Sequence, residues 1–192
     1  MPRAGLAPET VVDAAAALAD ADGLDSLTLA RLAKRLGVQP PSLYAHVGGL
    51  PDLRRRLAGR GARELAAALG GAAAGRAGGD ALAAVARAYR DYALAHPGTY
   101  AAARRATELD RADAEAAVDV VLAVLRGYGL EGDDGVHAAR IVRSALHGFA
   151  ALETGEGFGI PLDLDDTFAR LVAVLDQGLT GLPARAATAR GS

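Results

Sequence analysis

The sequence LTLARLAKRLGVQPPSLYAHV, residues 27–47, contains two short segments with helical spacing separated by a glycine. Thr28 is a suitable N-cap for the first segment, and the leucines after it recur every three or four residues. Gly37 occupies the position of a helix C-cap, and the prolines at 40–41 are tolerated in the first turn of a second helix. The pattern therefore predicts two helices that meet across about four residues.

Helical patterns also flank this stretch on both sides. Residues 8–22 carry an apolar stripe, and a leucine-rich segment starts near Pro51, with Gly59–Gly61 expected to weaken it locally. Five later segments show the same spacing: 80–97, 98–109, 114–129, 135–155 and 163–179. Only 4% of the residues are aromatic, Trp is absent, and no segment alternates as a strand would. The sequence predicts an all-α fold.

The net charge of −2 is unevenly distributed along the chain. Residues 26–63 contain eight Arg or Lys against the single acidic residue Asp52, a net charge of +7, so the remaining residues carry −9. A compact basic region on an acidic chain suits a protein that attracts phosphates at one end and stays soluble. A solvated helix face is the alternative explanation of the same charges.

The order of helix, glycine turn and short helix in residues 27–47 is that of helix-turn-helix DNA readers. With the flanking helices, residues 8–65 resemble the tetracycline-repressor (TetR) family of bacterial regulators. Residues 144–159, SALHGFAALETGEGFG, resemble the family branch named for a Trp-His-Gly signature, with Leu146 in place of the tryptophan. The resemblance implies a transcriptional regulator, by family default a repressor, that binds a palindromic operator as a homodimer and is released by a small-molecule effector.

Two domains and a tail are expected on this basis. Residues 6–66 form a three-helix helix-turn-helix DNA-binding domain, and residues 67–182 form a helical bundle for effector binding and dimerisation. The glycine-rich residues 70–79 are expected to be a loose loop near the boundary. Residues 183–192 are expected to be disordered.

Seven residues are candidate contacts with double-stranded DNA: Thr28, Gln39, Pro40, Ser42, Tyr44, His46 and Arg54. Gln39 is the best candidate base reader, because a carboxamide can form two hydrogen bonds with adenine. A polar turn residue is the alternative for this position. Tyr44 and His46 can donate to phosphate oxygens, and Thr28 can cap a helix whose N-terminus faces a phosphate.

One position departs from the family pattern. Many relatives place a lysine soon after the recognition helix to contact a phosphate, and this chain has Leu50 there. Arg54 or Arg55 is expected to take over that contact. Without such compensation, DNA binding would depend less steeply on salt.

The second half supplies candidates for the effector pocket and the dimer interface. The effector candidates are the large or polar-tipped side chains of an otherwise Ala- and Leu-rich region: Tyr89, Tyr92, His96, Tyr100, Arg104 and His147. Partly exposed core residues are the alternative for any one of them. The interface candidates are apolar residues of the last two helices: Leu146, Phe149, Phe168, Leu171 and Leu175. Gly148 and Gly178 would allow close helix approach there.

Other function classes find little support in the sequence. The absence of Cys excludes disulfides and Cys-ligated metals, and no signal or membrane-spanning segment is recognised, so a cytoplasmic protein without a membrane partner is expected. An all-α di-metal enzyme needs Glu-x-x-His pairs, and none is present. No catalytic residue, metal site or cofactor is assigned. An all-α enzyme and a helical interaction protein with a basic face remain the alternatives.

Overall fold

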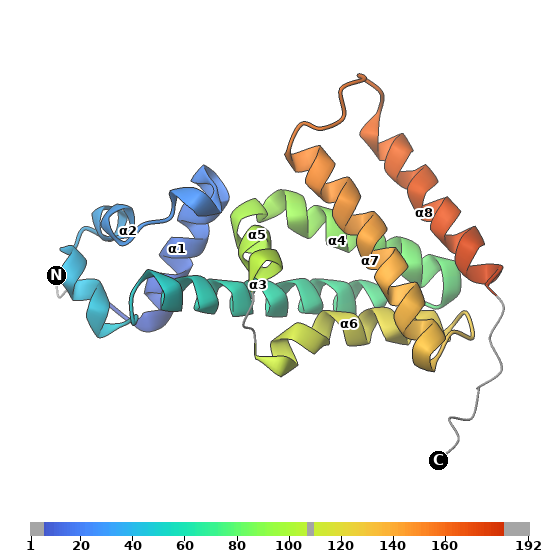
Figure 1. Cartoon of the computed structure of the whole chain (residues 1–192), viewed down its shortest axis with the longest axis horizontal. Helices are drawn as coiled ribbons and strands as arrows, with labels where there is room; N and C mark the ends of the chain where they lie inside the picture. Colours follow the sequence, from blue (N-terminus) through green and yellow to red (C-terminus); the bar gives the residue numbers. More distant parts are fainter. Residues whose placement is uncertain (1–5, 107–109, 183–192) are drawn as a thin grey trace, which may run out of the picture. The chain divides into compact units, whose positions relative to one another are not determined.

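The computed structural model describes residues 6–106 and 110–182, and these ranges are helical without a strand (Figure 1). The elements in chain order are α1 (Pro8–Asp22), η1 (Leu24–Ser26), α2 (Leu29–Leu36), η2 (Pro40–Ala45), α3 (Leu50–Ala73), α4 (Gly78–Ala95), α5 (Pro97–Arg105), α6 (Arg111–Arg126), α7 (Gly132–Thr154) and α8 (Leu164–Thr180). The two η elements are 3₁₀ turns. The prediction of an all-α fold is confirmed. The expected disordered tail lies outside the described residues.

The chain forms two compact units that do not follow one cut in the sequence. The first unit contains residues 1–65 and 92–116, and the second contains residues 66–91 and 117–192. The helix-turn-helix segment therefore shares its unit with α5 and the first turns of α6. Within the described residues, no helix is long and apolar enough to cross a membrane.

The core of the first unit is built from the apolar stripes that the sequence predicts. Its buried residues are Val11, Ala15, Ala16, Leu18, Ala19, Leu24, Leu27, Leu32, Ala33, Leu43, Val47, Leu53, Leu57, Ala58 and Ala102. Fourteen of these fifteen side chains lie before residue 60, and Ala102 adds α5 to the same core. Burying this leucine-rich surface is what holds the short elements α2 and η2 in place.

Helix α5 joins this core by unusually close contacts. A Cβ atom at Gly98 would lie 2.1 Å from the carbonyl of Ala19 in α1, so only glycine fits there. Asp20 of α1 accepts a hydrogen bond from the backbone N–H of Thr99 at 2.7 Å and thereby caps the start of α5. Because a side chain of α1 caps α5, these two helices are held against each other.

Helix α3 runs without a break through Gly59 and Gly61, where the sequence predicts local weakening. The expected loop over 70–79 is wrong in extent, because α3 continues to Ala73 and α4 begins at Gly78, which limits the loop to residues 74–77. Each glycine costs a helix interior about 1 kcal/mol. Buried leucines along α3, such as Leu57 and Leu69, offset that cost through packing.

Candidate nucleic-acid interface

The turn between α2 and η2 is fixed by caps at both ends of α2. Thr28 Oγ1 accepts a hydrogen bond from the backbone N–H of Arg31 at 3.2 Å. Gly37 has φ 67°, a left-handed conformation that favours glycine, and the N–H of Val38 donates to the carbonyl of Ala33 at 3.0 Å. The chain therefore leaves α2 in one defined direction toward η2.

The segment η2 occupies the place of the predicted second helix, but it is a 3₁₀ turn. Leu43 and Val47 are buried beneath it, and the backbone N–H of Ser42 donates to the carbonyl of Gln39 at 2.9 Å. With its inner side held by Leu43, the segment leaves the side chain of Tyr44 63% exposed. The result is a short, anchored element with polar side chains on its outer surface.

The structure places the seven predicted DNA contacts around this element. Thr28, Gln39, Ser42, Tyr44 and Arg54 are exposed, whereas Pro40 and His46 are half-buried. The Gln39 side chain forms no capping hydrogen bond with η2, so its amide is not used to stabilise the turn. These side chains come from the start of α2, from η2 with its flanking residues, and from the second turn of α3.

Leu50 and the three arginines of α3 have different environments. Leu50 is half-buried and packs against the core of the first unit, so it makes no phosphate contact of the kind a lysine would. Asp52 forms ion pairs with Arg55 and, at 2.9 Å, with Arg56. Arg54 is exposed and has neither a hydrogen bond nor an ion pair with the part of the chain that is described. Arg54 is thus available to an external anion.

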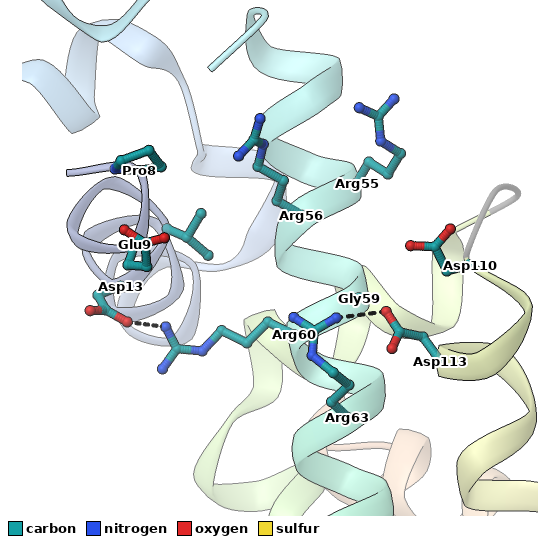
Figure 2. A pocket seen from close by; sticks show the side chains of 11 residues that line it. Pro8, Glu9, Asp13, Arg55, Arg56, Gly59, Arg60, Arg63, Asp110 and Asp113 are labelled. Atoms are coloured by element: carbon teal, nitrogen blue, oxygen red, sulfur yellow. Dashed lines mark hydrogen bonds and ion pairs between the residues drawn. The ribbon is translucent and has the colours of Figure 1, made fainter. Parts of the chain in front are cut away.

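Farther along α3, a groove of about 680 Å³ lies against α1 and the start of α6 (Figure 2). Its charged lining contains four arginines and four carboxylates: Arg55, Arg56, Arg60, Arg63, Glu9, Asp13, Asp110 and Asp113. Arg60 pairs with Asp13 of α1, and Arg63 pairs with Asp113 of α6 at 2.7 Å. Since the two signs balance, the groove does not attract anions as a basic surface does.

The predicted effector residues belong to both compact units. Tyr89 and His147 belong to the second unit, whereas Tyr92, His96, Tyr100 and Arg104 belong to the first. Tyr89, Tyr92 and Tyr100 are buried. Tyr92 donates a hydrogen bond to Glu64 at 3.0 Å, and the Nδ1 atom of His96 lies 3.3 Å from Asp20.

Among the effector candidates, Arg104 is distinguished by its buried Nε atom. Its side chain is half-buried, and its Nε is a buried atom without a hydrogen-bond partner in the described ranges 6–106 and 110–182. An unpaired buried donor is costly, which makes this position a candidate for a ligand or a bound water. His147, half-buried in α7, has a partner within the chain.

The predicted interface residues lie mostly inside the second unit. Leu146, Phe149, Phe168 and Leu175 are buried, and Leu171 is half-buried. The same helices leave other apolar or small residues toward solvent. We define the α7–α8 stripe as Ile141, Ala145, Gly148 and Leu152 of α7 with Leu171, Val174 and Gly178 of α8. Its most exposed side chains are Val174 (66%), Ile141 (50%) and Leu152 (47%).

Sequence reasoning missed three residues that organise the structure. Asp52 joins the end of η2 to α3, Asp20 caps α5, and Arg90 of α4 pairs with Glu153 of α7 at 2.5 Å and Asp165 of α8 at 2.7 Å. Arg90 also lies over the rings of Phe149 and Phe168 at 5.5 and 5.0 Å. Only Asp52 carried a signal in the sequence, as the one acidic residue among residues 26–63.

A capped helix, a glycine turn and an anchored short element with exposed polar side chains define a helix-turn-helix DNA-binding protein. Two family models match the chain: "Bacterial regulatory proteins, tetR family" over residues 11–48, and "Tetracyclin repressor-like, C-terminal domain" over residues 82–175. Together they cover both the helix-turn-helix segment and most of the helices that follow it.

Individual proteins agree with the family models. The chain is 41% identical over 182 residues to the uncharacterized HTH-type transcriptional regulator Rv0681 of Mycobacterium tuberculosis, a match covering 92% of this chain and 83% of that one. It is 36% identical to the uncharacterized HTH-type transcriptional regulator YobS of Bacillus subtilis, covering 93% and 95%. A protein with unknown function from Rhodococcus superposes with a TM-score of 0.77 at 25% identity, covering 93% and 98%. The chain belongs to the TetR family of bacterial transcriptional regulators.

Proposed function

We propose that this regulator is a homodimeric repressor that binds a palindromic operator through η2 and is released by a small-molecule effector. The observation that carries the proposal is the anchoring of η2 by buried Leu43 and Val47 with Gln39 and Tyr44 facing solvent. An element held this way can enter a major groove without a large loss of conformational entropy. Exposed Lys34, Arg35 and Arg54, which form no ion pair in the described chain, supply the attraction to phosphates, whereas the other five basic residues of 26–63 pair with carboxylates.

The contacts divide into base reading and phosphate binding. Gln39, whose side chain forms no cap with η2, reads a base edge, and Ser42 assists it from the next turn. Thr28 at the N-terminus of α2, Tyr44, His46 and Arg54 bind phosphates. Pro40 sets the backbone direction at the start of η2.

The exposure and spacing of the α7–α8 stripe support dimerisation through it. On α7 its members recur at intervals of four, three and four residues, which places them along one side of the helix. An added Cβ at Gly148 or Gly178 would meet no other described atom within 4 Å, so a second helix can approach closely. Leu171 is half-buried, so it contributes both to the edge of the buried core and to the α7–α8 stripe.

Effector binding is proposed on Arg104, whose buried Nε has no hydrogen-bond partner in the described part of the chain. A carboxylate or carbonyl group of a small molecule would satisfy that donor. Tyr100, on the same helix, and Tyr92 and His96, in the same compact unit, would add apolar contacts and polar tips. Occupation of this position would act on α5, which is joined to α1 through Asp20 and Thr99.

The experiment is selection of bound duplexes from a random DNA library by the full chain at near-physiological salt. We expect enrichment of a palindrome whose half-sites are about one helical turn apart. Gln39→Ala should alter base preference at one half-site position, with a loss of about 1–3 kcal/mol for the preferred base. Tyr44→Phe should weaken binding to all duplexes alike. Absence of any enriched sequence, with and without candidate effectors, would reject the proposal.

A further inference from the structure

Asp52, in the first turn of α3, is the most highly connected charged residue next to η2. Its carboxylate accepts a hydrogen bond from the backbone N–H of Gly48 at 3.0 Å and pairs with Arg55 and Arg56. Only 12% of its side chain is exposed. One carboxylate therefore holds the turn that follows η2 and two of the three adjacent arginines.

The carboxylate stays ionised near neutral pH. The hydrogen bond donated by the Gly48 N–H lowers the pKa of Asp52, and burial opposes this effect. The charges of Arg56 and Arg55 lower the pKa further. Its negative charge is thus a fixed feature of the surface next to η2. It is also the only acidic charge among residues 26–63.

We infer that Asp52 is a positioning residue that reduces the sequence-independent affinity of this protein for DNA. The inference rests on the proposed DNA-binding function. Phosphate contacts give affinity without specificity, and their number sets the dependence on salt. Asp52 and the arginines at 54–56 together carry a net charge of +2. Of the three arginines, only Arg54 lacks an ion-pair partner in the described chain. Even when Arg55 swings toward a phosphate, the carboxylate that it leaves repels the DNA.

The same carboxylate favours specific reading by a separate contact. Gly49 has φ 100°, the chain bends at Gly48 and Gly49 between η2 and α3, and the Gly48–Asp52 hydrogen bond fixes this bend. A neutral acceptor at this position should hold the Gly48 N–H less strongly and loosen the orientation of η2, and loss of the charge should free two arginines. Affinity for unrelated DNA rises, and discrimination between operator and unrelated DNA falls.

The test measures binding of the full chain to a random-sequence duplex and to the selected duplex across a range of salt concentrations. Asp52→Asn removes the charge and keeps an oxygen that can accept from Gly48. The matched control is Asp166→Asn, which removes one carboxylate from another Asp–Arg pair four residues apart, with Arg170 at 3.0 Å, in the second unit. Both variants change the net charge by the same amount.

We expect Asp52→Asn to bind the random duplex more tightly than the wild type, with a salt slope steeper by about 1–2. The ratio of selected-duplex to random-duplex affinity should fall, and Asp166→Asn should match the wild type. A purely structural role for Asp52 predicts weaker binding to both duplexes with an unchanged slope, and that result overturns the inference. Asp52→Ser, which also keeps a short oxygen acceptor, repeats the test if Asp52→Asn does not fold.

The outcomes separate this inference from the function on which it rests. A wild-type protein that selects a duplex, combined with identical slopes for the wild type and Asp52→Asn, rejects the role of Asp52 alone. A wild-type protein without salt-dependent DNA binding rejects both proposals. Adding Arg55→Gln and Arg56→Gln to Asp52→Asn should return the slope toward the wild-type value, since the freed charges are then gone.

Discussion

The three consecutive arginines at 54–56 carry the same charge, yet the fold gives them different partners. Sequence reasoning left Arg54 and Arg55 as equal replacements for the missing lysine at Leu50. The carboxylate of Asp52 separates them, because it pairs with Arg55 and Arg56 and leaves Arg54 without an ion pair in the described chain. Helical spacing accounts for this choice, because Arg55 and Arg56 lie three and four residues after Asp52 and face it, whereas Arg54 lies two residues after it and does not.

Arg54→Gln should weaken binding of the protein to all duplexes and make the salt slope shallower by about 0.9, the value of one phosphate contact. The comparison variant is Arg87→Gln, which removes an exposed arginine from α4 and should leave the slope unchanged. Fluorescence anisotropy across a salt series measures both. An unchanged slope for Arg54→Gln would show that Arg54 does not contact the DNA backbone.

Tyr92 links α4 to α3, and its ionisation should affect stability at high pH. Burial and the nearby Glu64 charge raise the pKa of Tyr92 above its ordinary value. The unfolded chain therefore loses this proton first, so the stabilisation is complete below about pH 10 and decreases as pH rises beyond it. Tyr92→Phe loses the hydrogen bond to Glu64, and its free energy of unfolding at neutral pH should fall by about 1 kcal/mol.

Urea unfolding at a series of pH values measures this effect. The difference in free energy of unfolding between the wild type and Tyr92→Phe should shrink above about pH 10. Tyr44→Phe provides the comparison, because the Tyr44 side chain is 63% exposed and its loss should hardly change stability. A constant difference between the wild type and Tyr92→Phe at all pH values would contradict the proposed coupling to Tyr92 ionisation.

At the scale of elements, the sequence pattern predicts where helices form, whereas the packing of one helix on another depends on contacts between distant residues. Periodicity identified the apolar stripes of α1 and α2 because each stripe is a local pattern. The association of α5 with α1 depends on contacts such as Asp20 to Thr99, which join residues 79 positions apart. Gly61 similarly allows α5 to approach α3, since a Cβ there would lie 2.7 Å from the carbonyl of Thr99. In the sequence these glycines indicated only a weakened helix.

Gly98→Ala tests the contact between α5 and α1. The new methyl group would overlap the Ala19 carbonyl, so the free energy of unfolding should fall by about 3 kcal/mol. Gly71→Ala, at an exposed site in α3 with no described atom within 4 Å, should instead raise it by up to about 1 kcal/mol through helix propensity. Chemical denaturation should give changes in the free energy of unfolding of opposite sign for the two variants. A stabilised Gly98→Ala protein would refute the close contact.

At the scale of the whole molecule, the sequence pattern does not determine which apolar face of α7 would contact a second copy of the chain. Both sides of α7 carry apolar residues, and periodicity shows that two stripes exist without showing which one covers its own core. The structure buries Leu146 and Phe149 and leaves Ile141 and Leu152 exposed. The dimer proposed here therefore uses the face that the sequence analysis had not selected on α7.

Val174→Asp should convert the proposed dimer into a monomer, because it places a charge on the α7–α8 stripe at a side chain that is 66% exposed. The monomer should stay folded and lose most of its affinity for the selected palindrome, since one η2 element contacts too few base pairs for tight specific binding. Val136→Asp is the control: Val136 is 39% exposed on α7 and lies about 140° around the helix from Ile141. Sedimentation velocity and melting temperature distinguish dissociation from unfolding. If Val174→Asp remains dimeric and binds the palindrome normally, the interface lies elsewhere and the α7–α8 stripe has another role.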